Sequence, residues 1–134
     1  MERFFLGEAW LDLGRCYVLG GNVGAAEWAL RTAIEVAGKC IRARAELGAL
    51  LRRLGRIEEA VAQFQDALAL ATAKMERDPT FAYAHSDLAF VYRAMGDSEA
   101  AEQADQRAVE LGRRSNDEER RVVSMEALDQ HGNL

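Results

Sequence analysis

The sequence contains only two cysteines, one proline and no long hydrophobic run. Cys16 and Cys40 form no CxxC motif and have no histidine pair nearby, so we expect neither a zinc site nor a disulfide framework. No stretch of 18 apolar residues occurs, and the N-terminus lacks the apolar core and small-residue cleavage site of a signal peptide. These absences predict a soluble, cytoplasmic protein in a reducing compartment, with no membrane span.

A broad basic surface and catalytic motifs are also missing. The net charge of −5 argues against nonspecific nucleic-acid binding. No Ser–His–acid set, HExxH, GxxxxGK[ST] or GxGxxG pattern is present. His85 and Asp87 do not make a catalytic pair, because side chains two residues apart on a helix do not face each other. We therefore expect no enzymatic activity, no metal and no cofactor.

What the sequence does contain is a unit of similar residues that occurs three times. Its middle copy is Leu47-Gly48, Leu51, Gly55, Ala60, Phe64 and Ala67. One copy lies 34 residues earlier and another 41 residues later, which predicts a repeat architecture. The equivalent residues are Leu13-Gly14, Tyr17, Gly21, Ala26, Leu30 and Ala33 in the first copy, and Leu88-Ala89, Tyr92, Gly96, Ala101, Asp105 and Ala108 in the third.

Apolar residues at helical spacing divide each copy into two helices with a glycine turn between them. In the second copy, alanines and Lys74 extend the second helix to about Arg77, seven residues beyond the regular length. Asp78-Pro79 ends it, because proline disfavours helical geometry in the residue before it. A cap signal at Ser115-Asn116 predicts a break before a final helix. The expected helices are about 3–19, 23–38, 41–54, 57–77, 80–95, 98–114 and 117–130.

The repeated unit resembles the tetratricopeptide repeat, a 34-residue helix–turn–helix motif. The segment Trp10-x-x-Leu13-Gly14-x-x-Tyr17 fits the first half of that motif, and Pro79 fits its closing proline once the extra residues are allowed. The resemblance covers roughly residues 5–114. It implies an all-α solenoid in one domain, residues 1–134. Its parts would be three repeats, at about 7–40, 41–81 and 82–115, and a C-terminal capping helix at about 117–130.

The third repeat departs from the family pattern. His85 stands where Trp10 does in the first repeat, as Arg44 does in the second, and Asp105 takes the place of Phe64. A charged residue at that position predicts that the last helix is not fully covered, since the end of a stack of repeats needs a polar cap.

The resemblance implies a non-enzymatic scaffold that binds a peptide or helix of a partner protein in a groove. In this family the first helix of each pair lines that groove. Asp12, Glu46 and Asp87 hold equivalent positions and would form an acidic row. Arg15, Arg52 and Arg93 would form a basic row beside it, which favours an acidic partner. The expected groove residues are Asp12, Arg15, Arg42, Glu46, Arg52, Arg53, Tyr83, Asp87, Phe90 and Arg93.

Two interpretations of these charges stay open at this stage. The arginines could bind carboxylates of a partner in bidentate fashion. Alternatively, Asp12 with Arg15 and Arg42 with Glu46 could neutralise each other along a single helix.

Some family members clamp a C-terminal carboxylate with lysines and asparagines. The matching positions here hold Leu11, Arg15, Glu46, Tyr83 and Asp87, so a co-chaperone role of that kind is disfavoured.

A second possible function is a structural or chaperone-like role through self-association. Phe4 and Phe5 precede the first repeat motif. They either fold back on the first helix pair or leave an apolar patch at an open end of the stack. In the second case we expect a homodimer.

Overall fold

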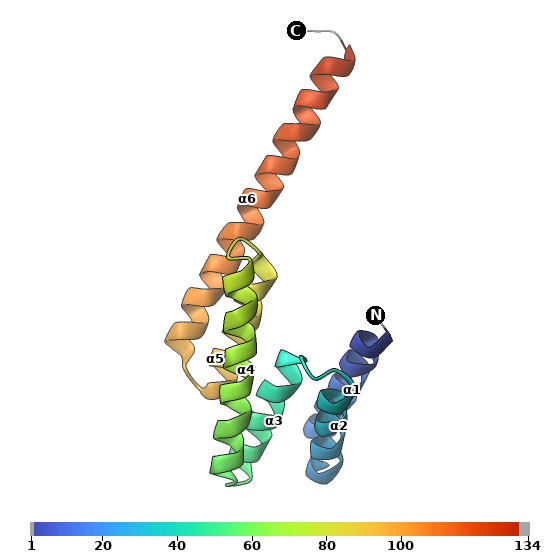
Figure 1. The fold of residues 1–134 in the computed structure, drawn as a ribbon, viewed down its shortest axis with the longest axis vertical. Helices are drawn as coiled ribbons and strands as arrows, with labels where there is room; N and C mark the ends of the chain where they lie inside the picture. Colours follow the sequence, from blue (N-terminus) through green and yellow to red (C-terminus); the bar gives the residue numbers. More distant parts are fainter. Residues whose placement is uncertain (1, 132–134) are drawn as a thin grey trace.

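The computed structural model describes residues 2–131, and the side chains of residues 5–130. These residues form six α-helices and no strand (Figure 1). The fold is therefore all-α, as the repeats predict. The helices are α1 (Glu2–Leu19), α2 (Val23–Val36), α3 (Ile41–Arg53), α4 (Ile57–Arg77), α5 (Ala82–Met95) and α6 (Ser98–His131).

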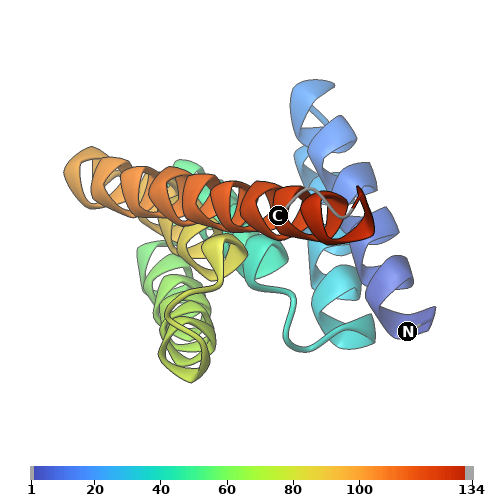
Figure 2. The ribbon, with the colours of Figure 1, turned by 90° about the horizontal axis from the view of Figure 1, so that it is seen from above.

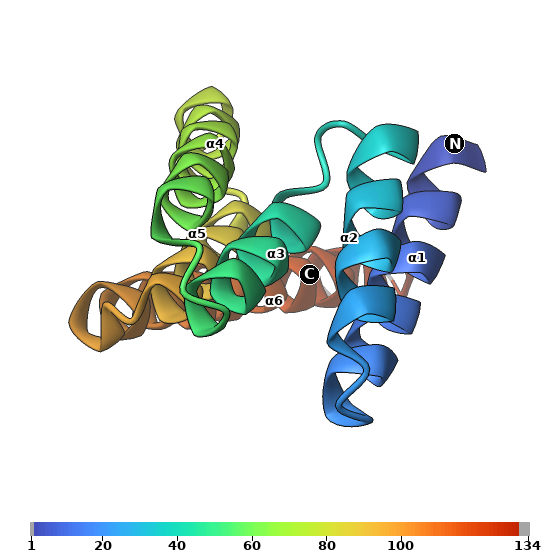
Figure 3. The ribbon, with the colours of Figure 1, turned by 90° about the horizontal axis from the view of Figure 1, so that it is seen from below.

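The helices pack as three consecutive pairs, α1 with α2, α3 with α4 and α5 with α6. Contacts between pairs join α2 to α3, and α3 and α4 to α5. Figure 3 shows this order, from α1 and α2 at one side through α3 to α4 and α5 at the other. The arrangement is a helical-repeat solenoid, because most contacts between pairs join pairs that are neighbours in sequence.

The turn inside each pair depends on a glycine in the left-handed conformation. Gly21, Gly55 and Gly96 have φ of 77°, 79° and 90°, which residues with a Cβ rarely adopt. The glycine spacing found in the sequence therefore marks the three turns correctly.

Close approach within a pair depends on the small residue of the Leu-Gly motif. A Cβ on Gly48 would lie 2.7 Å from Phe64 of the partner helix, and one on Gly14 would lie 2.8 Å from Leu30. Leu30, Leu47 and Leu51 are completely buried between the helices. The repeat motif thus defines the helix–helix contacts of the core.

The first pair also contains both tryptophans of the sequence. Trp10 of α1 and Trp28 of α2 meet edge to face, with ring centroids 4.9 Å apart and planes at 88°. Trp28 is 56% exposed, so this aromatic contact lies at the border of the core.

The predicted lengthening of α4 is confirmed. The helix runs without interruption for 21 residues to Arg77, and Asp78 follows as its C-cap. Ala71 is its last buried residue, and Met75 of the added turns is partly buried against the core.

The predicted break at Ser115-Asn116 is wrong, because α6 continues as a single helix of 34 residues to His131. Serine and asparagine favour caps but cost only a few tenths of a kcal/mol inside a helix. Glu110 and Arg114, with 2.6 Å between their charged atoms, link the two turns just before that site. All side chains from Arg113 to Gln130 are exposed. Residues 117–130 are therefore not a separate capping helix but the projecting half of α6, which extends away from the helix pairs in Figure 1 and passes in front of α1 and α2 in the view of Figure 2.

Candidate functional site

The first helices of the three pairs, α1, α3 and α5, share one surface, here called the inner face. Arg15 of α1 donates from Nε to Oε1 of Glu46 on α3, at 3.2 Å. Arg42 of α3 donates from Nε to Oδ1 of Asp87 on α5, also at 3.2 Å. Each contact joins a cation of one pair to an acid of the next, so the inner face is continuous over all three pairs.

These contacts contradict the interpretation in which charges pair along one helix. Arg15 binds Glu46 rather than Asp12, and Arg42 binds Asp87 rather than Glu46. The cause for Arg42 is that Asp87 is only 3% exposed and a buried carboxylate requires a cation.

Aromatic rings lie beside the same arginines. The guanidinium carbon of Arg42 lies 4.8 Å from the Phe90 ring centroid and 5.5 Å from that of Tyr83. Arg15 lies 5.4 Å from Phe90. Rings at these distances hold a guanidinium through cation–π attraction. The arginines of the inner face are therefore fixed in position by acids and rings together.

Asp87 has a second cation partner that the sequence analysis did not identify. Lys74 donates from Nζ to Oδ2 of Asp87 at 2.7 Å, and Nζ lies 4.8 Å from the Tyr83 ring centroid. Lys74 belongs to the added turns of α4. A helix of regular length would end before Lys74. The seven extra residues of the second repeat were therefore the sequence feature from which a cation beside Asp87 could have been predicted.

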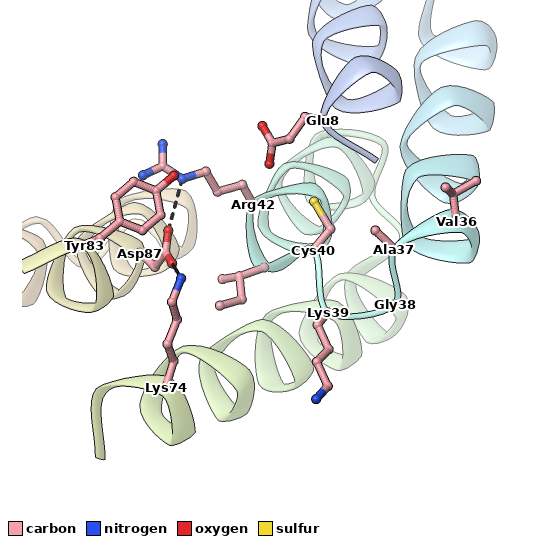
Figure 4. A pocket seen from close by; sticks show the side chains of 11 residues that line it. Glu8, Val36, Ala37, Gly38, Lys39, Cys40, Arg42, Lys74, Tyr83 and Asp87 are labelled. Carbon is pink, nitrogen blue, oxygen red and sulfur yellow. Dashed lines mark hydrogen bonds and ion pairs between the residues drawn. The ribbon is translucent and has the colours of Figure 1, made fainter. Parts of the chain in front are cut away.

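A pocket of about 340 Å³ opens where these residues meet (Figure 4). It draws on α1, the turn between α2 and α3, and the nearby parts of α3, α4 and α5. Arg42, Lys74 and Tyr83 surround Asp87, whereas Lys39 points away from them. The residues that line this pocket are Glu8, Val36, Ala37, Gly38, Lys39, Cys40, Ile41, Arg42, Lys74, Tyr83 and Asp87.

Cys40 is a small apolar component of this pocket. Burial raises the pKa of its thiol above the usual value, so the group is protonated at neutral pH. A protonated thiol is a poor nucleophile and a poor metal ligand. Within the part of the chain that the structure describes, no group of three or more His, Cys, Asp or Glu residues is placed to hold a metal ion.

The other members of the predicted basic row have separate roles. Arg52 donates from Nη1 to the carbonyl oxygen of Met95 at 2.8 Å, and thus binds the C-terminal end of α5. Arg93 forms an ion pair with Asp105 of α6. Asp12 and Arg53 are exposed, and among residues 5–130 neither side chain has a hydrogen bond or ion pair. The inner face therefore has no uninterrupted row of unpaired arginines.

His85 is a packed residue. It is 9% exposed and its Nε2 lies 2.8 Å from the carbonyl oxygen of Pro79, so it holds the turn that precedes α5.

The predicted apolar patch at the N-terminal end is described only in part. The Phe4 side chain lies outside the described residues, whereas Phe5 is 65% exposed and Leu6 52% exposed. None of the helices that the structure describes is long and apolar enough to span a membrane.

The match to a family model agrees with the helical-repeat fold. The family model described as tetratricopeptide repeat matches residues 39–114. The crystal structure of MamA is 21% identical, with a TM-score of 0.47 over 83% of this chain and 61% of that one. The MamA MSR-1 structure is 30% identical, with a TM-score of 0.44 over 81% of this chain and 59% of that one. This chain thus spans about three fifths of the length of these two MamA chains. No curated protein sequence matches it.

Proposed function

Because the chain belongs to the tetratricopeptide repeat family, we propose that it is a scaffold that binds a peptide or helix of a partner protein on its inner face. Proteins of this family mediate protein–protein interactions and are typically non-enzymatic. The proposal includes one domain of three repeats, at about residues 7–40, 41–81 and 82–115, with the predicted groove residues and Lys74 as contacts.

The observation that carries this proposal is the pocket on the inner face. It combines an exposed aromatic side chain, Tyr83 at 49% exposure, with two fixed cations, Arg42 and Lys74. Tyrosine and arginine are enriched among the residues that dominate binding at protein interfaces. A volume of about 340 Å³ suits one or two side chains of a partner.

The test compares an inner-face variant with a variant elsewhere. Tyr83→Ala removes the exposed ring, and Val109→Ala removes a 63% exposed side chain on α6 as a matched control. A partner is first identified by affinity capture with the wild-type chain and mass spectrometry, and its affinity for each variant is then measured by calorimetry. Loss of a central aromatic anchor costs about 2 kcal/mol or more, so we expect Tyr83→Ala to weaken binding more than tenfold. Equal affinities for Tyr83→Ala and the wild type would disprove binding through this pocket.

Self-association is the second candidate function, and two exposed apolar regions favour it. One is Phe5 with Leu6 at the N-terminal end. The other is the projecting half of α6, which exposes Val122, Val123, Met125 and Leu128. Multi-angle light scattering at micromolar concentration separates the candidates, because a monomer leaves the inner face free. If the chain is a dimer, the same measurement is repeated on Phe5→Ser and on a chain that ends at Arg114. The variant that becomes a monomer identifies the region that forms the dimer contact.

A further inference from the structure

The pocket contains hydrogen-bond donors that its own acid does not use. Arg42 engages Asp87 through Nε, and within the described residues its two terminal nitrogens have no hydrogen-bond partner. Lys74 makes one hydrogen bond, to Asp87, although an ammonium group carries three donors. Two cations therefore share one carboxylate, so the cluster of Arg42, Lys74 and Asp87 has one more cation than acid.

These donors are held in place before any ligand arrives. The Asp87 side chain is only 5% exposed and binds both cations, at 3.2 Å and 2.7 Å. The Tyr83 ring lies within 5.5 Å of the Arg42 guanidinium and 4.8 Å of Lys74 Nζ. A site whose side chains are already ordered loses less entropy on binding than one whose side chains are free.

The other residues that line the pocket determine which ligands fit it in shape and charge. Ala37, Cys40 and Ile41 offer an apolar wall next to the cations. Glu8 lies on the α1 side of the same pocket, and its negative charge repels a ligand with several negative charges more strongly than a ligand with one. The combination favours a single carboxylate attached to an aliphatic group.

We propose that this pocket is the anchor site for the side-chain carboxylate of a glutamate or aspartate, flanked by an aliphatic residue, in the partner segment. The carboxylate accepts hydrogen bonds from the free donors of Arg42 and Lys74, and the aliphatic side chain lies against Ile41 and Cys40. The seven-residue lengthening of α4 creates this site, since it supplies Lys74. This inference depends on the proposed function, because it names the partner chemistry that the inner face recognises.

Three dipeptides test the proposal by NMR titration of the ¹⁵N-labelled full chain at low salt. Acetyl-Leu-Glu-amide carries the side-chain carboxylate, acetyl-Leu-Gln-amide is its neutral isostere, and acetyl-Leu-Leu with a free C-terminus carries only a terminal carboxylate. We expect saturable shifts of the Arg42 Nε–H and of the Tyr83 amide with the Glu dipeptide, at millimolar affinity. The Gln dipeptide should bind about tenfold more weakly, since hydrogen bonds to a charged group are stronger. Equal binding of the Glu and Gln dipeptides overturns the proposal, as does tighter binding of the free C-terminus.

Matched lysine variants locate the site. Lys74→Gln should reduce affinity for the Glu dipeptide about tenfold, while Lys74→Arg restores most of it. Lys39→Gln is the control, because Lys39 also lines the pocket but points away from Arg42 (Figure 4). An amide spectrum that keeps its dispersion shows that each variant is folded. If Lys74→Gln binds like the wild type, the assignment is wrong.

The dipeptide and lysine experiments can fail without disproving the proposed binding of a partner on the inner face. A partner that is lost with Tyr83→Ala, together with dipeptides that do not discriminate charge, leaves binding on the inner face intact and removes only the carboxylate anchor.

Discussion

Arg15 of the first repeat and Glu46 of the second face each other across the inner face, with 3.2 Å between Nε and Oε1. Their side chains are 37% and 28% exposed, so the pair adds little to the free energy of folding. Its effect is on the position of Arg15, which the pair holds near Phe90 of the third repeat. Arg15 thus contacts residues of all three repeats. The position of its side chain on the inner face therefore depends on how neighbouring repeats pack against each other.

Acid should weaken the contact between α2 and the start of α4. Glu27 accepts hydrogen bonds from Arg56, at 2.6 Å, and from Arg31, at 2.9 Å, and chiefly the Arg56 bond lowers the pKa of Glu27. A carboxyl with a lowered pKa stabilises the fold above its unfolded-state pKa of about 4.3. That contribution is lost as pH falls through the lower folded-state value. Urea unfolding at pH 7 should show Glu27→Gln less stable than the wild type, and at pH 3 the difference should shrink.

Glu35→Gln is the control for this pH dependence. Glu35 is an exposed residue of the same helix and has no ion pair within residues 5–130. Glu35→Gln should change the free energy of unfolding by less than about 0.5 kcal/mol at either pH, because the exposed side chain has no ion pair to lose. An undiminished difference between Glu27→Gln and the wild type at pH 3 would contradict the assignment.

The glycine of the Leu-Gly motif should not tolerate even one added carbon. In Gly48→Ala, the new Cβ would lie 2.7 Å from the Phe64 ring, which is itself buried. Overpacking of this kind costs roughly 1–3 kcal/mol. Gly24→Ala is the control, because nothing lies within 4 Å of that position and a helical alanine is favoured by about 0.4–1 kcal/mol. Thermal unfolding followed by circular dichroism should move in opposite directions for the two variants.

Neighbouring arginines of α3 should differ in their effect on stability. The Arg52 side chain binds the carbonyl oxygen of Met95 at the end of α5, whereas the Arg53 side chain makes no hydrogen bond in the described structure. Arg52→Ala should therefore lower the free energy of unfolding by about 1 kcal/mol, the net value of one hydrogen bond. Arg53→Ala should change it by less than about half of that. Equal effects in urea unfolding would mean that the contact with Met95 does not contribute.

The projecting half of α6 should be dispensable for the stability of the repeats. Leu111 is the last buried residue of that helix, and all side chains from Arg113 to Gln130 are exposed. A chain that ends at Arg114 should have a melting temperature within a few degrees of the full chain, because residues 115–130 bury no side chain against the repeats. A large drop in melting temperature would indicate that residues beyond Arg114 pack against the repeats.

The repeats and their turns could be predicted from sequence because each depends on local requirements. Gly21 and Gly96 are needed for left-handed turns, and Gly48 for close helix contact. The break at Ser115-Asn116 could not be judged locally, because good cap residues also fit inside a helix when the flanking turns are helical. A capping signal without a glycine or proline is weak evidence for a helix end.

The ion pairs of the inner face could not be predicted from spacing along one helix. Asp87 is paired with Arg42, 45 residues away, and with Lys74, 13 residues away. Which residues of neighbouring repeats meet depends on how the pairs are rotated against each other. That rotation depends on the packing of whole helices and on the length of α4. The ion pairs of Arg15 and Arg42 therefore join neighbouring helix pairs rather than residues of one helix.

The pairing of Trp10 with Trp28 makes indole fluorescence a probe of one repeat only. Both tryptophans of the sequence belong to the first helix pair, which contacts the second pair through the packing of α2 on α3 and through Arg15 of α1. Far-ultraviolet circular dichroism, by contrast, averages over all six helices. In a solenoid, each repeat has its own stability and a coupling to its neighbour. The difference between the fluorescence and dichroism midpoints would thus measure how strongly the first repeat is coupled to the second.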